Sequence, residues 1–269
     1  MHMIRISAVI FDWAGTTVDH GCFAPVAPFV EALRRHGVAI SDADARGPMG
    51  LDKKEHLRAL LALPDADGQW RDAHGHGPTS QDIERIYLDM MPLALESVAA
   101  HGGLIAGLLN AVEELRGRGI KIGASTGYFR EAAHACYESA AKQGYTPDFA
   151  VCASDVAQGR PAPWMVFRNM EGLGVYPAEA VLKVGDTVPD IGEGLNAGCW
   201  SAGVVATGND LGLSEAEFSA LAADERSRRM NAVRDKLLDA GAHDVVDSIR
   251  DVPRLVEEID ERLASGERP

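Results

Sequence analysis

The segment IRISAVIFDWAGTT, residues Ile4–Thr17, carries the clearest structural signal in the chain. Its first eight residues are mostly apolar and rich in β-branched side chains, and the run stops abruptly at Asp12. Such a run is typical of a strand that is buried on both faces, as in a parallel sheet. The segment therefore predicts a buried strand whose carboxyl end presents Asp12.

Four further runs of this kind follow, and segments with helical period separate them. They are KIGAST (Lys121–Thr126), FAVCAS (Phe149–Ser154), AVLKVGD (Ala180–Asp186) and WSAGVVA (Trp200–Ala206). Helices are predicted at Leu104–Arg118 and Asp251–Leu263, because each carries apolar residues on one stripe. The alternation predicts an α/β fold with a Rossmann-like parallel sheet and helices on both faces.

Between the first strand and Leu104, about eighty residues show helical period without a convincing strand, which is too long for a simple connection. Three helices are predicted there, at Pro25–His36, Leu51–Leu63 and Ser80–Ala100. We therefore expect an all-helical cap domain at residues 21–100. It would be inserted into an α/β domain made of residues 1–20 and 101–269.

Local signals add detail to the predicted cap. Thr79 is a candidate N-cap of its third helix, and Pro92 is expected to interrupt that helix. The stretch Asp65–Gly77 is polar and contains glycine, so it is predicted to be a loop.

Composition places the chain among soluble globular proteins, with 46% apolar and 25% charged residues. Acidic residues outnumber lysine and arginine by 40 to 26, and the net charge of −14 opposes nonspecific binding to nucleic acid or anionic membranes. The four cysteines have no CxxC spacing, so they suggest neither a zinc site nor a disulfide framework, and a reducing cytoplasm is expected. No apolar run is long enough for a membrane helix.

Polar side chains stand at the carboxyl ends of several predicted strands, where open parallel sheets bind their ligands. Asp12, Thr126 and Asp186 each end a strand, and Asp190 lies four residues beyond Asp186. The three carboxylates would repel one another unless a cation joined them, and hard carboxylate oxygens suit Mg²⁺. Each residue alone is an ordinary turn former. Together they predict a magnesium site beside a carboxylate nucleophile, as phosphoryl transfer requires.

Other groups are placed to bind phosphoryl oxygens. The planar guanidinium of Arg160 fits two oxygens, although arginines at helix starts are often only surface ion pairs. Thr126 and Gly127 are expected to hydrogen-bond another oxygen, together with the backbone amides of Gly15–Thr17.

The order of these residues resembles the signature of the haloacid dehalogenase superfamily. The matching segments are DWAGTT (Asp12–Thr17), STG (Ser125–Gly127), GRP (Gly159–Pro161) and GDTVPD (Gly185–Asp190). The resemblance implies that Asp12, the backbone carbonyl of Ala14 and Asp186 hold Mg²⁺. Asp190 would assist directly or through water.

One departure from the superfamily pattern is informative. Phosphatases of this superfamily carry a second aspartate two residues after the nucleophile, which protonates an alkoxide leaving group, and Ala14 stands there instead. Without that acid, cleavage of a P–O bond would be slow, because general acid catalysis is commonly worth about 10²–10⁴-fold. Either the chain is therefore a poor catalyst, or its leaving group is activated in another way.

The predicted cap supplies a group that could do so. MGLDKKEH (Met49–His56) places Lys53 and His56 on one helical face, and a lysine can form an imine with a carbonyl substrate. By composition alone, Lys53 and Lys54 would be interpreted as charged side chains on a solvent-exposed helix surface. However, DWAGTT, MGLDKKEH and GRPAPWM (Gly159–Met165) together resemble the phosphonoacetaldehyde hydrolase, or phosphonatase, family.

This second resemblance implies a small phosphonate substrate, phosphonoacetaldehyde, whose C–P bond is hydrolysed to acetaldehyde and phosphate. Lys53 would condense with the aldehyde, and the protonated imine would accept the electrons of the broken bond. Asp12 would attack phosphorus and become an aspartyl phosphate. Lys53 must be neutral, which costs roughly 4 kcal/mol at pH 7.5 for an ordinary amine, so a dry pocket is expected to lower its pKa.

The remaining residues would complete the pocket. Cys22, Met49 and Tyr128 are expected to line it and exclude water, although Cys22 is nearly as well explained as a small buried residue. His56 is expected to contact the substrate or relay protons, the alternative being a histidine on the helix surface.

Because Asp12 and Lys53 would lie in different domains, the site is complete only when the cap closes, and hinges are expected near Gly21 and Gly102–Gly103. The resemblance also implies a homodimer joined through cap helices. Two rival functions stay open, namely hydrolysis of phosphate esters such as sugar phosphates and a non-catalytic scaffold role. Activity on p-nitrophenyl phosphate that exceeds activity on phosphonoacetaldehyde would favour the first. The second is disfavoured by the presence of Asp12, Asp186, Arg160 and Lys53, because binding alone does not require a nucleophile.

Overall fold

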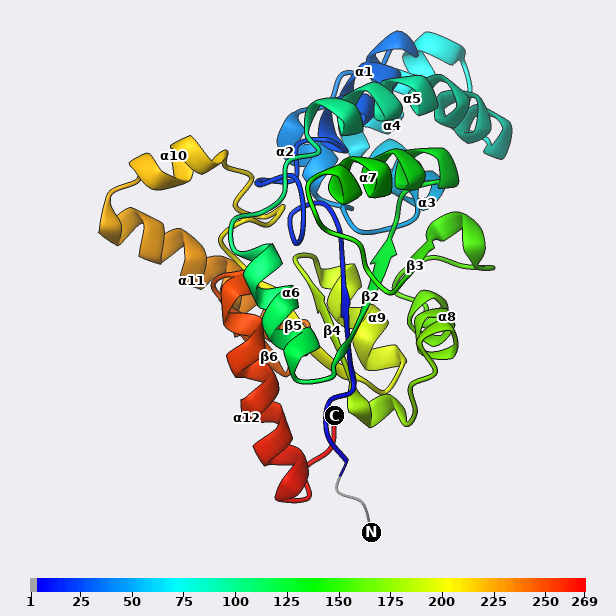
Figure 1. Cartoon of the computed structure of the whole chain (residues 1–269). Helices are drawn as coiled ribbons and strands as arrows, with labels where there is room; N and C mark the ends of the chain where they lie inside the picture. The colour runs from blue at the N-terminus through cyan, green and yellow to red at the C-terminus, as the bar shows by residue number, and fades with distance from the viewer. Residues whose placement is uncertain (1–3) are drawn as a thin grey trace.

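The computed structural model of the chain, shown in Figure 1, describes residues 4–269. Their strands form one parallel sheet of six strands in the order β3-β2-β1-β4-β5-β6. In chain order the strands are β1 (Ala8–Phe11), β2 (Lys121–Thr126), β3 (Phe149–Cys152), β4 (Val181–Gly185), β5 (Trp200–Val204) and β6 (Asp244–Val246). Since β1 lies between β2 and β4, the sheet has its topological switch point at the carboxyl end of β1. The predicted α/β fold with a Rossmann-like sheet is confirmed.

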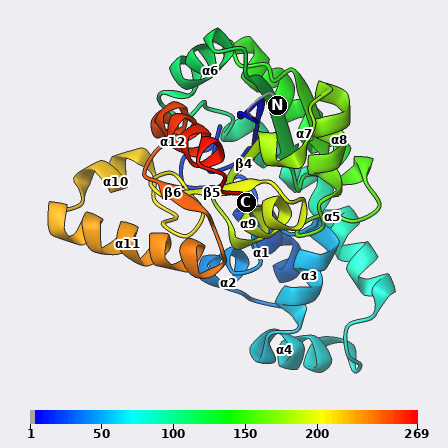
Figure 2. The same cartoon turned by 90° about the horizontal axis from the view of Figure 1, so that it is seen from below.

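Helices cover both faces of this sheet (Figures 1 and 2). One face carries α6 (Leu108–Gly117), α7 (Arg130–Lys142) and α12 (Val252–Ala264), and the other carries α8 (Trp164–Leu173), α9 (Val188–Asn196) and α11 (Ala223–Asp239). α10 (Glu215–Ala220) and the start of α11 extend away from the sheet. Short 3₁₀ helices lie at Ala153–Asp155, Ala178–Ala180 and Ile249–Asp251.

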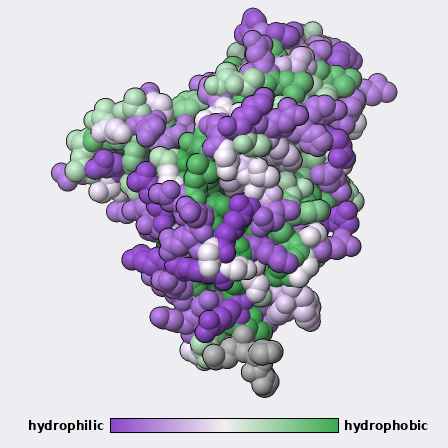
Figure 3. Space-filling view, in the orientation of Figure 1, coloured by the Kyte–Doolittle hydropathy of each residue, from purple (hydrophilic) through white to green (hydrophobic). Residues whose placement is uncertain are grey.

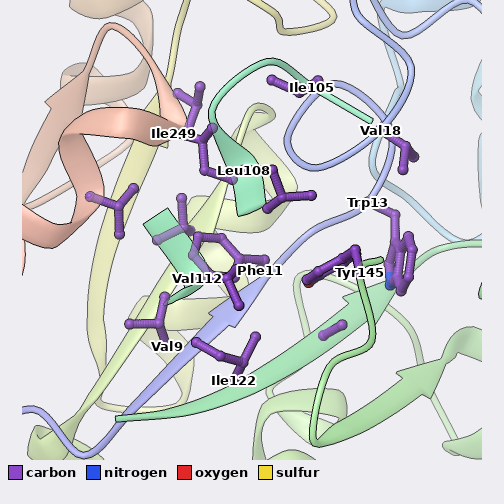
Figure 4. Packing of buried hydrophobic residues seen from close by; sticks show 14 of the residues in the cluster. Val9, Phe11, Trp13, Val18, Ile105, Leu108, Val112, Ile122, Tyr145 and Ile249 are labelled. Carbon is purple, nitrogen blue, oxygen red and sulfur yellow. The ribbon is translucent and has the colours of Figure 1, made fainter. Parts of the chain in front are cut away.

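Alternate residues of β1 enter different hydrophobic clusters. Val9 and Phe11 pack with Ile122 of β2 and Val112 of α6, as Figure 4 shows. Ile10 points to the opposite face, into the cluster beneath α8. All four residues of β1 are buried, as the sequence predicts. Packing from both sides fixes β1 and therefore the residue that follows it.

Five helices between β1 and α6 form a separate lobe over the carboxyl ends of the strands, here called the cap. They are α1 (Val26–Arg35), α2 (Asp42–Arg46), α3 (Lys53–Leu61), α4 (Pro64–His74) and α5 (Ser80–Ala100). The cap has its own hydrophobic cluster, in which Phe29 and Trp70 are fully buried. α5 connects the two bodies, because Ile86 belongs to the cap cluster while Val98 packs in the cluster of the sheet. The predicted all-helical insert is confirmed.

The chain enters and leaves the cap at neighbouring points. The Asp19 amide donates to the Gly103 carbonyl at 3.0 Å, and the Ile105 amide donates to the Thr17 carbonyl at 2.9 Å. The two crossings therefore form one short hydrogen-bonded connection between the bodies.

The domain boundaries at residues 20/21 and 100/101 stay a prediction, as do hinges at Gly21 and Gly102–Gly103, which concern motion. The predicted α/β domain begins at residue 1, and its residues 1–3 lie outside the described part of the chain.

The predicted loop at Asp65–Gly77 is wrong, because most of it belongs to helix α4. Pro64 occupies the first turn, where its missing N–H is not needed, and Gly75 ends the helix with φ 76°. Trp70 is fully buried and anchors the helix in the cap cluster. This mostly polar stretch is therefore helical because suitable residues begin and end the helix and one buried aromatic side chain anchors it.

α5 runs without interruption through Pro92, contrary to the break predicted there. The helix is anchored on both sides of the proline, in the cap cluster before it and in the sheet cluster after it, so the loss of one backbone hydrogen bond does not end it. Its predicted N-cap is confirmed: the Thr79 hydroxyl accepts from the Asp82 amide, and the Asp82 carboxylate accepts from the Thr79 amide.

Four elements lie outside those predicted, namely α2, α10, α11 and the edge strand β6. β6 has only three residues, which is too short for a strand pattern. α11 is long but buries only Val233 and Leu237, so its hydrophobic period is weak.

Within residues 4–269, no helix combines the length and apolar character that crossing a bilayer requires. The face of the molecule in Figure 3 is mostly hydrophilic.

Candidate active site

A small cavity of about 30 Å³ lies between the strand ends and the cap. Nine of the predicted site residues line it: Asp12, Ala14, Cys22, Met49, Lys53, Thr126, Gly127, Tyr128 and Arg160. Pro25, Gly50 and Thr187 complete the lining. The other three predicted site residues, His56, Asp186 and Asp190, are fully buried and are not part of the lining. The fold thus brings residues from the cap and from several sheet loops to one small space.

The turn after β1 shapes the first wall of the cavity. Asp12 is only 6% exposed, and the amides of Gly15–Thr17 all donate within the turn, to the carbonyls of Trp13 and Val18. The prediction that these three amides bind phosphoryl oxygens is therefore wrong, because the tight turn already satisfies them. Within residues 4–269, the amides of Trp13 and Ala14 have no acceptor, so these two are available to a ligand.

Gly15 is required by the close approach of this turn to β4. Its φ is +86°, and a Cβ atom at this position would lie 2.4 Å from Asp186 Oδ2. The absence of a side chain therefore allows the turn to hold Asp12 close to the second strand-end carboxylate.

Six charged side chains form a buried cluster at the strand ends. They are the carboxylates of Asp12, Asp186, Asp190 and Glu193 and the cations of Arg160 and Lys183, none more than 6% exposed. Four negative against two positive charges leave two formal negative charges uncompensated. Oxygens of the three aspartates lie within 4.8 Å of one another. A set of hard oxygens with this excess charge fits a divalent cation such as Mg²⁺.

The carboxylates of this cluster have shifted acidities. Burial raises the pKa of Asp186 well above its usual range, and the carboxylates of Asp12 and Asp190 raise it further. The Asn209 amide opposes this shift by donating to Asp186 at 2.7 Å. Burial also raises the pKa of Asp12, and Arg160 opposes that shift. A divalent cation at this point would favour the ionised form of both carboxylates.

Arg160 connects the cluster to the cavity. Its Nη2 lies 2.7 Å from Asp12 Oδ1, its Nη1 3.0 Å from Asp190 and its Nε 3.0 Å from Glu193. Nη2 also donates to the hydroxyl and carbonyl oxygens of Ser125. These contacts use most of the donors of the guanidinium, so Arg160 mainly orients Asp12. Its predicted contact with a phosphonate oxygen stays a prediction.

Asp190 is engaged on both oxygens. Oδ1 accepts from Lys183 Nζ at 2.7 Å, and Oδ2 accepts from the Thr187 hydroxyl at 2.5 Å. The cations of Arg160 and Lys183 lower the pKa of Asp190 despite its burial. Asp190 is therefore a fixed anion at the centre of the cluster.

Lys53 reaches the cavity from the cap. It is the first residue of α3, is 6% exposed, and places Nζ 5.1 Å from the centre of the Tyr128 ring and 5.4 Å from that of Phe29. No carboxylate in residues 4–269 lies within 4.0 Å of this nitrogen. Burial lowers the pKa of Lys53 to about 8, with Arg160 acting in the same direction. Lys54, by contrast, is paired at the surface with Glu84 at 2.6 Å.

Comparison with known proteins agrees with this geometry. A family model described as haloacid dehalogenase-like hydrolase matches residues 6–198. The phosphonoacetaldehyde hydrolase of Syntrophobacter fumaroxidans is 52% identical over 264 residues, which cover 98% of this chain and 95% of that protein. The enzyme of the same name from Paraburkholderia xenovorans is 45% identical over 267 residues, which cover 99% and 100% of the two chains. The chain belongs to the phosphonoacetaldehyde hydrolase family.

Solved structures agree. A crystal structure of a phosphonoacetaldehyde hydrolase-like protein from Oleispira antarctica matches with a TM-score of 0.97 and 38% identity, covering 98% of this chain and 96% of that one. A β-phosphoglucomutase from Clostridium difficile, at 16% identity and a TM-score of 0.69 with 97% and 100% coverage, shares only the fold. It is the family model over residues 6–198 that makes this phosphonoacetaldehyde hydrolase family member a haloacid dehalogenase-like hydrolase.

In this family member His56 is a buried residue, which excludes the helix-surface alternative. Its Nε2 lies 2.9 Å from the Ala45 carbonyl, and its ring stacks on Phe29 at 3.8 Å between centres. Burial lowers the pKa of His56 to about 3, and the neighbouring charge of Lys53 contributes. The ring is therefore neutral at ordinary pH. Its contact with substrate and its proton relay stay predictions, since it lies outside the cavity lining.

Three uncharged side chains form one wall of the cavity, and their exclusion of water from a substrate stays a prediction. Cys22, Met49 and Tyr128 are all less than 5% exposed and all line it. Burial raises the pKa of Cys22 and that of Tyr128 well above their usual values, so neither carries charge. Lys53 therefore faces an apolar surface that favours its neutral form.

Sequence reasoning missed two members of the charged cluster, Lys183 and Glu193. Both are fully buried, with Lys183 Nζ 3.6 Å from Glu193 Oε2. A signal existed for each: a lysine within the apolar run AVLKVGD needs a buried acidic partner, and Glu193 follows Asp190 by three residues and so shares its helix face.

The cap of this phosphonoacetaldehyde hydrolase family member is in direct contact with the sheet domain. A Cβ atom at Gly50 would lie 2.3 Å from Thr187 Oγ1, and one at Gly127 would lie 3.0 Å from the Leu51 carbonyl. The loop that carries Met49 thus touches two loops of the sheet domain. Glycine permits backbone contact at both points.

Proposed function

We propose that this chain hydrolyses the C–P bond of phosphonoacetaldehyde to acetaldehyde and phosphate. The observation that carries the proposal is that a buried amine, Lys53, and a strand-end carboxylate, Asp12, line one small cavity. Among residues 4–269, no carboxylate lies within 4.0 Å of this amine. The names of relatives that are 45–52% identical over nearly the whole chain support the same substrate.

The first step is imine formation at Lys53. The neutral amine adds to the aldehyde carbon, water leaves, and the protonated imine is positioned to accept an electron pair. With a pKa of about 8, a substantial fraction of Lys53 is neutral near pH 7.5. The apolar side chains around Lys53 keep the cavity dry, which limits competing hydrolysis of the imine.

The second step is attack of Asp12 on phosphorus. An Oδ–P bond forms while the C–P bond breaks, and its electron pair moves into the imine to give an enamine. Arg160, 2.7 Å from Asp12, holds the carboxylate in position. The amides of Trp13 and Ala14, together with Thr126 and Gly127, are the groups placed to bind phosphoryl oxygens.

The last steps restore both residues. Water hydrolyses the aspartyl phosphate and releases phosphate. The enamine takes a proton at carbon, and hydrolysis of the resulting imine frees acetaldehyde and Lys53. Since the leaving group is a carbon held as an enamine, no acid is needed at the position of Ala14.

Mg²⁺ is the cofactor that fits the charged cluster. Asp12, Asp186 and the Ala14 carbonyl would hold it, and bound Mg²⁺ would neutralise charge on the phosphoryl group. Within residues 4–269 no donor reaches the Ala14 carbonyl, which leaves that oxygen available. Asp190 is predicted to assist Mg²⁺ either directly or through water. Because both of its carboxylate oxygens already accept hydrogen bonds, assistance through water suits it better.

The decisive test is borohydride reduction with phosphonoacetaldehyde present, followed by peptide mass mapping. Lys53→Met should abolish both acetaldehyde release and the adduct on the peptide Met49–His56. Lys54→Met, which removes the adjacent lysine with its surface partner, should leave both unchanged. Acetaldehyde release without an adduct would refute the imine, and higher activity of the chain on p-nitrophenyl phosphate would favour an ester hydrolase.

We also propose the division into an α/β domain and a cap at residues 21–100, a homodimer formed through cap helices, and a cytoplasmic location. The four cysteines support the last point, because all are buried free thiols. Size-exclusion chromatography with light scattering tests the dimer.

A further inference from the structure

Arg46, the last residue of α2, plays no part in the reaction above, yet it holds several chain segments together. Its Nη1 donates to the carbonyls of Gly21 at 2.8 Å and Cys22 at 3.2 Å. The same nitrogen lies 3.2 Å from the Asn209 carbonyl and 3.3 Å from its Oδ1. The guanidinium also lies over the Phe23 ring, 5.1 Å from its centre. One cap residue thus contacts both the crossing into the cap and a loop of the sheet domain.

Asn209 also donates a hydrogen bond back to Arg46 and another to the charged cluster. Its Nδ2 donates to the Arg46 carbonyl at 3.1 Å, and its backbone amide donates to Asp186 at 2.7 Å. Asn209 is 2% exposed, whereas Arg46 is half-buried. The pair therefore links a cap helix, through one buried residue, to a carboxylate of the cluster.

The loop around Asn209 is also fitted to the crossing. The Gly21 amide donates to the Thr207 carbonyl at 2.8 Å, and a Cβ atom at Gly21 would lie 2.4 Å from the Leu213 carbonyl. A Cβ atom at Gly212 would lie 2.9 Å from the Arg46 guanidinium. Residues 207–213 thus enclose Arg46 against the point where the chain enters the cap.

We propose that Arg46 and Asn209 form a latch that holds the cap closed, and that they are positioning residues for the reaction. Both partners of the latch lie outside the cavity lining. Arg46 bonds to carbonyl and amide groups, and within residues 4–269 no carboxylate lies within 4.0 Å of it, so opening the latch breaks hydrogen bonds without separating an ion pair. Closure is what brings Lys53 into the cavity of Asp12.

The catalytic part of this inference rests on the proposed function. If the latch sets the fraction of closed molecules, its loss weakens the apparent affinity for substrate in proportion to that fraction. The bound substrate itself contacts both bodies, so saturating substrate should restore much of the closed form.

The test compares Arg46→Gln with Arg71→Gln. Arg71 is an exposed arginine of the same cap, and its one ion pair among residues 4–269 is with Asp67. Arg46→Gln should raise KM for phosphonoacetaldehyde by about tenfold or more with a smaller change in kcat, because uniform loss of binding acts on KM. Arg46→Lys should recover part of the effect, and Arg71→Gln should behave like the unaltered enzyme.

Amide hydrogen exchange of the unaltered chain and the variants, without substrate, separates this inference from the proposed function. Arg46→Gln should speed exchange at residues 19–24 and 207–213, whatever the reaction is. Unchanged exchange there, or unchanged KM in an active enzyme, overturns the latch. Absence of acetaldehyde release from the unaltered chain would instead refute the proposed function. Should Arg46→Gln fail to fold, Asn209→Ala is measured in the same two ways.

Discussion

Two adjacent lysines show how position decides chemistry at the scale of single residues. Lys53 begins α3 and points into the cavity between two aromatic rings, while Lys54 lies over Tyr87 at 4.8 Å and pairs with Glu84. The two side chains are chemically identical. Burial lowers the pKa of Lys53 to about 8, so a fraction of this amine is neutral near pH 7.5, as the proposed attack on an aldehyde requires.

The lowered pKa of Lys53 predicts the pH dependence of imine formation. Because only the neutral amine attacks, the rate of borohydride trapping should rise with pH and level off above about 8. Lys54→Met should show the same profile. A rate that keeps rising toward pH 10.5, the usual value for lysine, would contradict the prediction. The same shift reduces stability at neutral pH, and this loss should disappear as the pH rises from about 8 toward 10.5.

Sequence reasoning predicts residues that stand at strand ends better than the residues that support them. Asp12 and Asp186 follow apolar runs, so their place at the sheet edge follows from the pattern. Lys183 and Glu193 act only through mutual burial, which depends on tertiary packing. The prediction for the amides of Gly15–Thr17 fails, because residue types do not reveal that hydrogen bonds inside the turn already use these amides.

At the scale of elements, α4 shows the limit of judging by composition. Its residues are mostly polar, yet Pro64 starts the helix, Gly75 ends it and Trp70 anchors it. Strands β1 to β5 were predictable because each is a buried apolar run, whereas β6 is too short and α11 too polar. Some helices and strands are stabilised mainly by the residues at their ends or by contacts with neighbouring segments. The sequences of such elements show little hydrophobic periodicity.

Two glycines of the α4 region should respond in opposite directions to the same substitution. Gly68 lies inside the helix with nothing within 4 Å of a Cβ, so Gly68→Ala should raise the free energy of unfolding by about 0.5–1 kcal/mol. Gly75 also has open space but a φ of +76°, so Gly75→Ala should lower it by about 1 kcal/mol. Urea denaturation measures both. Equal effects of the two substitutions would argue against the helix.

At the scale of the whole molecule, the site depends on two bodies meeting. The switch point of the sheet places Asp12 beside the end of β4, and the closed cap brings Lys53 over it. The sequence predicts both bodies, because a long helical insert after the first strand is visible in its period. The two bodies meet where the backbone at Gly50 and at Gly127 comes close to residues of the other body. The sequence alone does not reveal which glycines make such contacts.

Preventing closure should impair activity without unfolding the cap. In Gly50→Ala, the new Cβ would meet Thr187 Oγ1 at 2.3 Å, so kcat/KM for phosphonoacetaldehyde should fall by about tenfold or more. Gly37→Ala is the matched control, because Gly37 also lies in the cap with positive φ but faces Ala73 of the cap itself. The control should lower thermal stability and keep kcat/KM. Equal kcat/KM in the two variants would contradict a role for closure.

The hydrogen bond between the Asp19 amide and the Gly103 carbonyl means that the inserted segment begins and ends at almost the same place. An insert with adjoining ends can be lengthened, shortened or replaced without moving the strand beneath it. Exchange of that one segment would bring in a new reactive side chain and a new binding wall together. Different substrates can therefore be accommodated by exchanging the insert while the sheet domain stays unchanged.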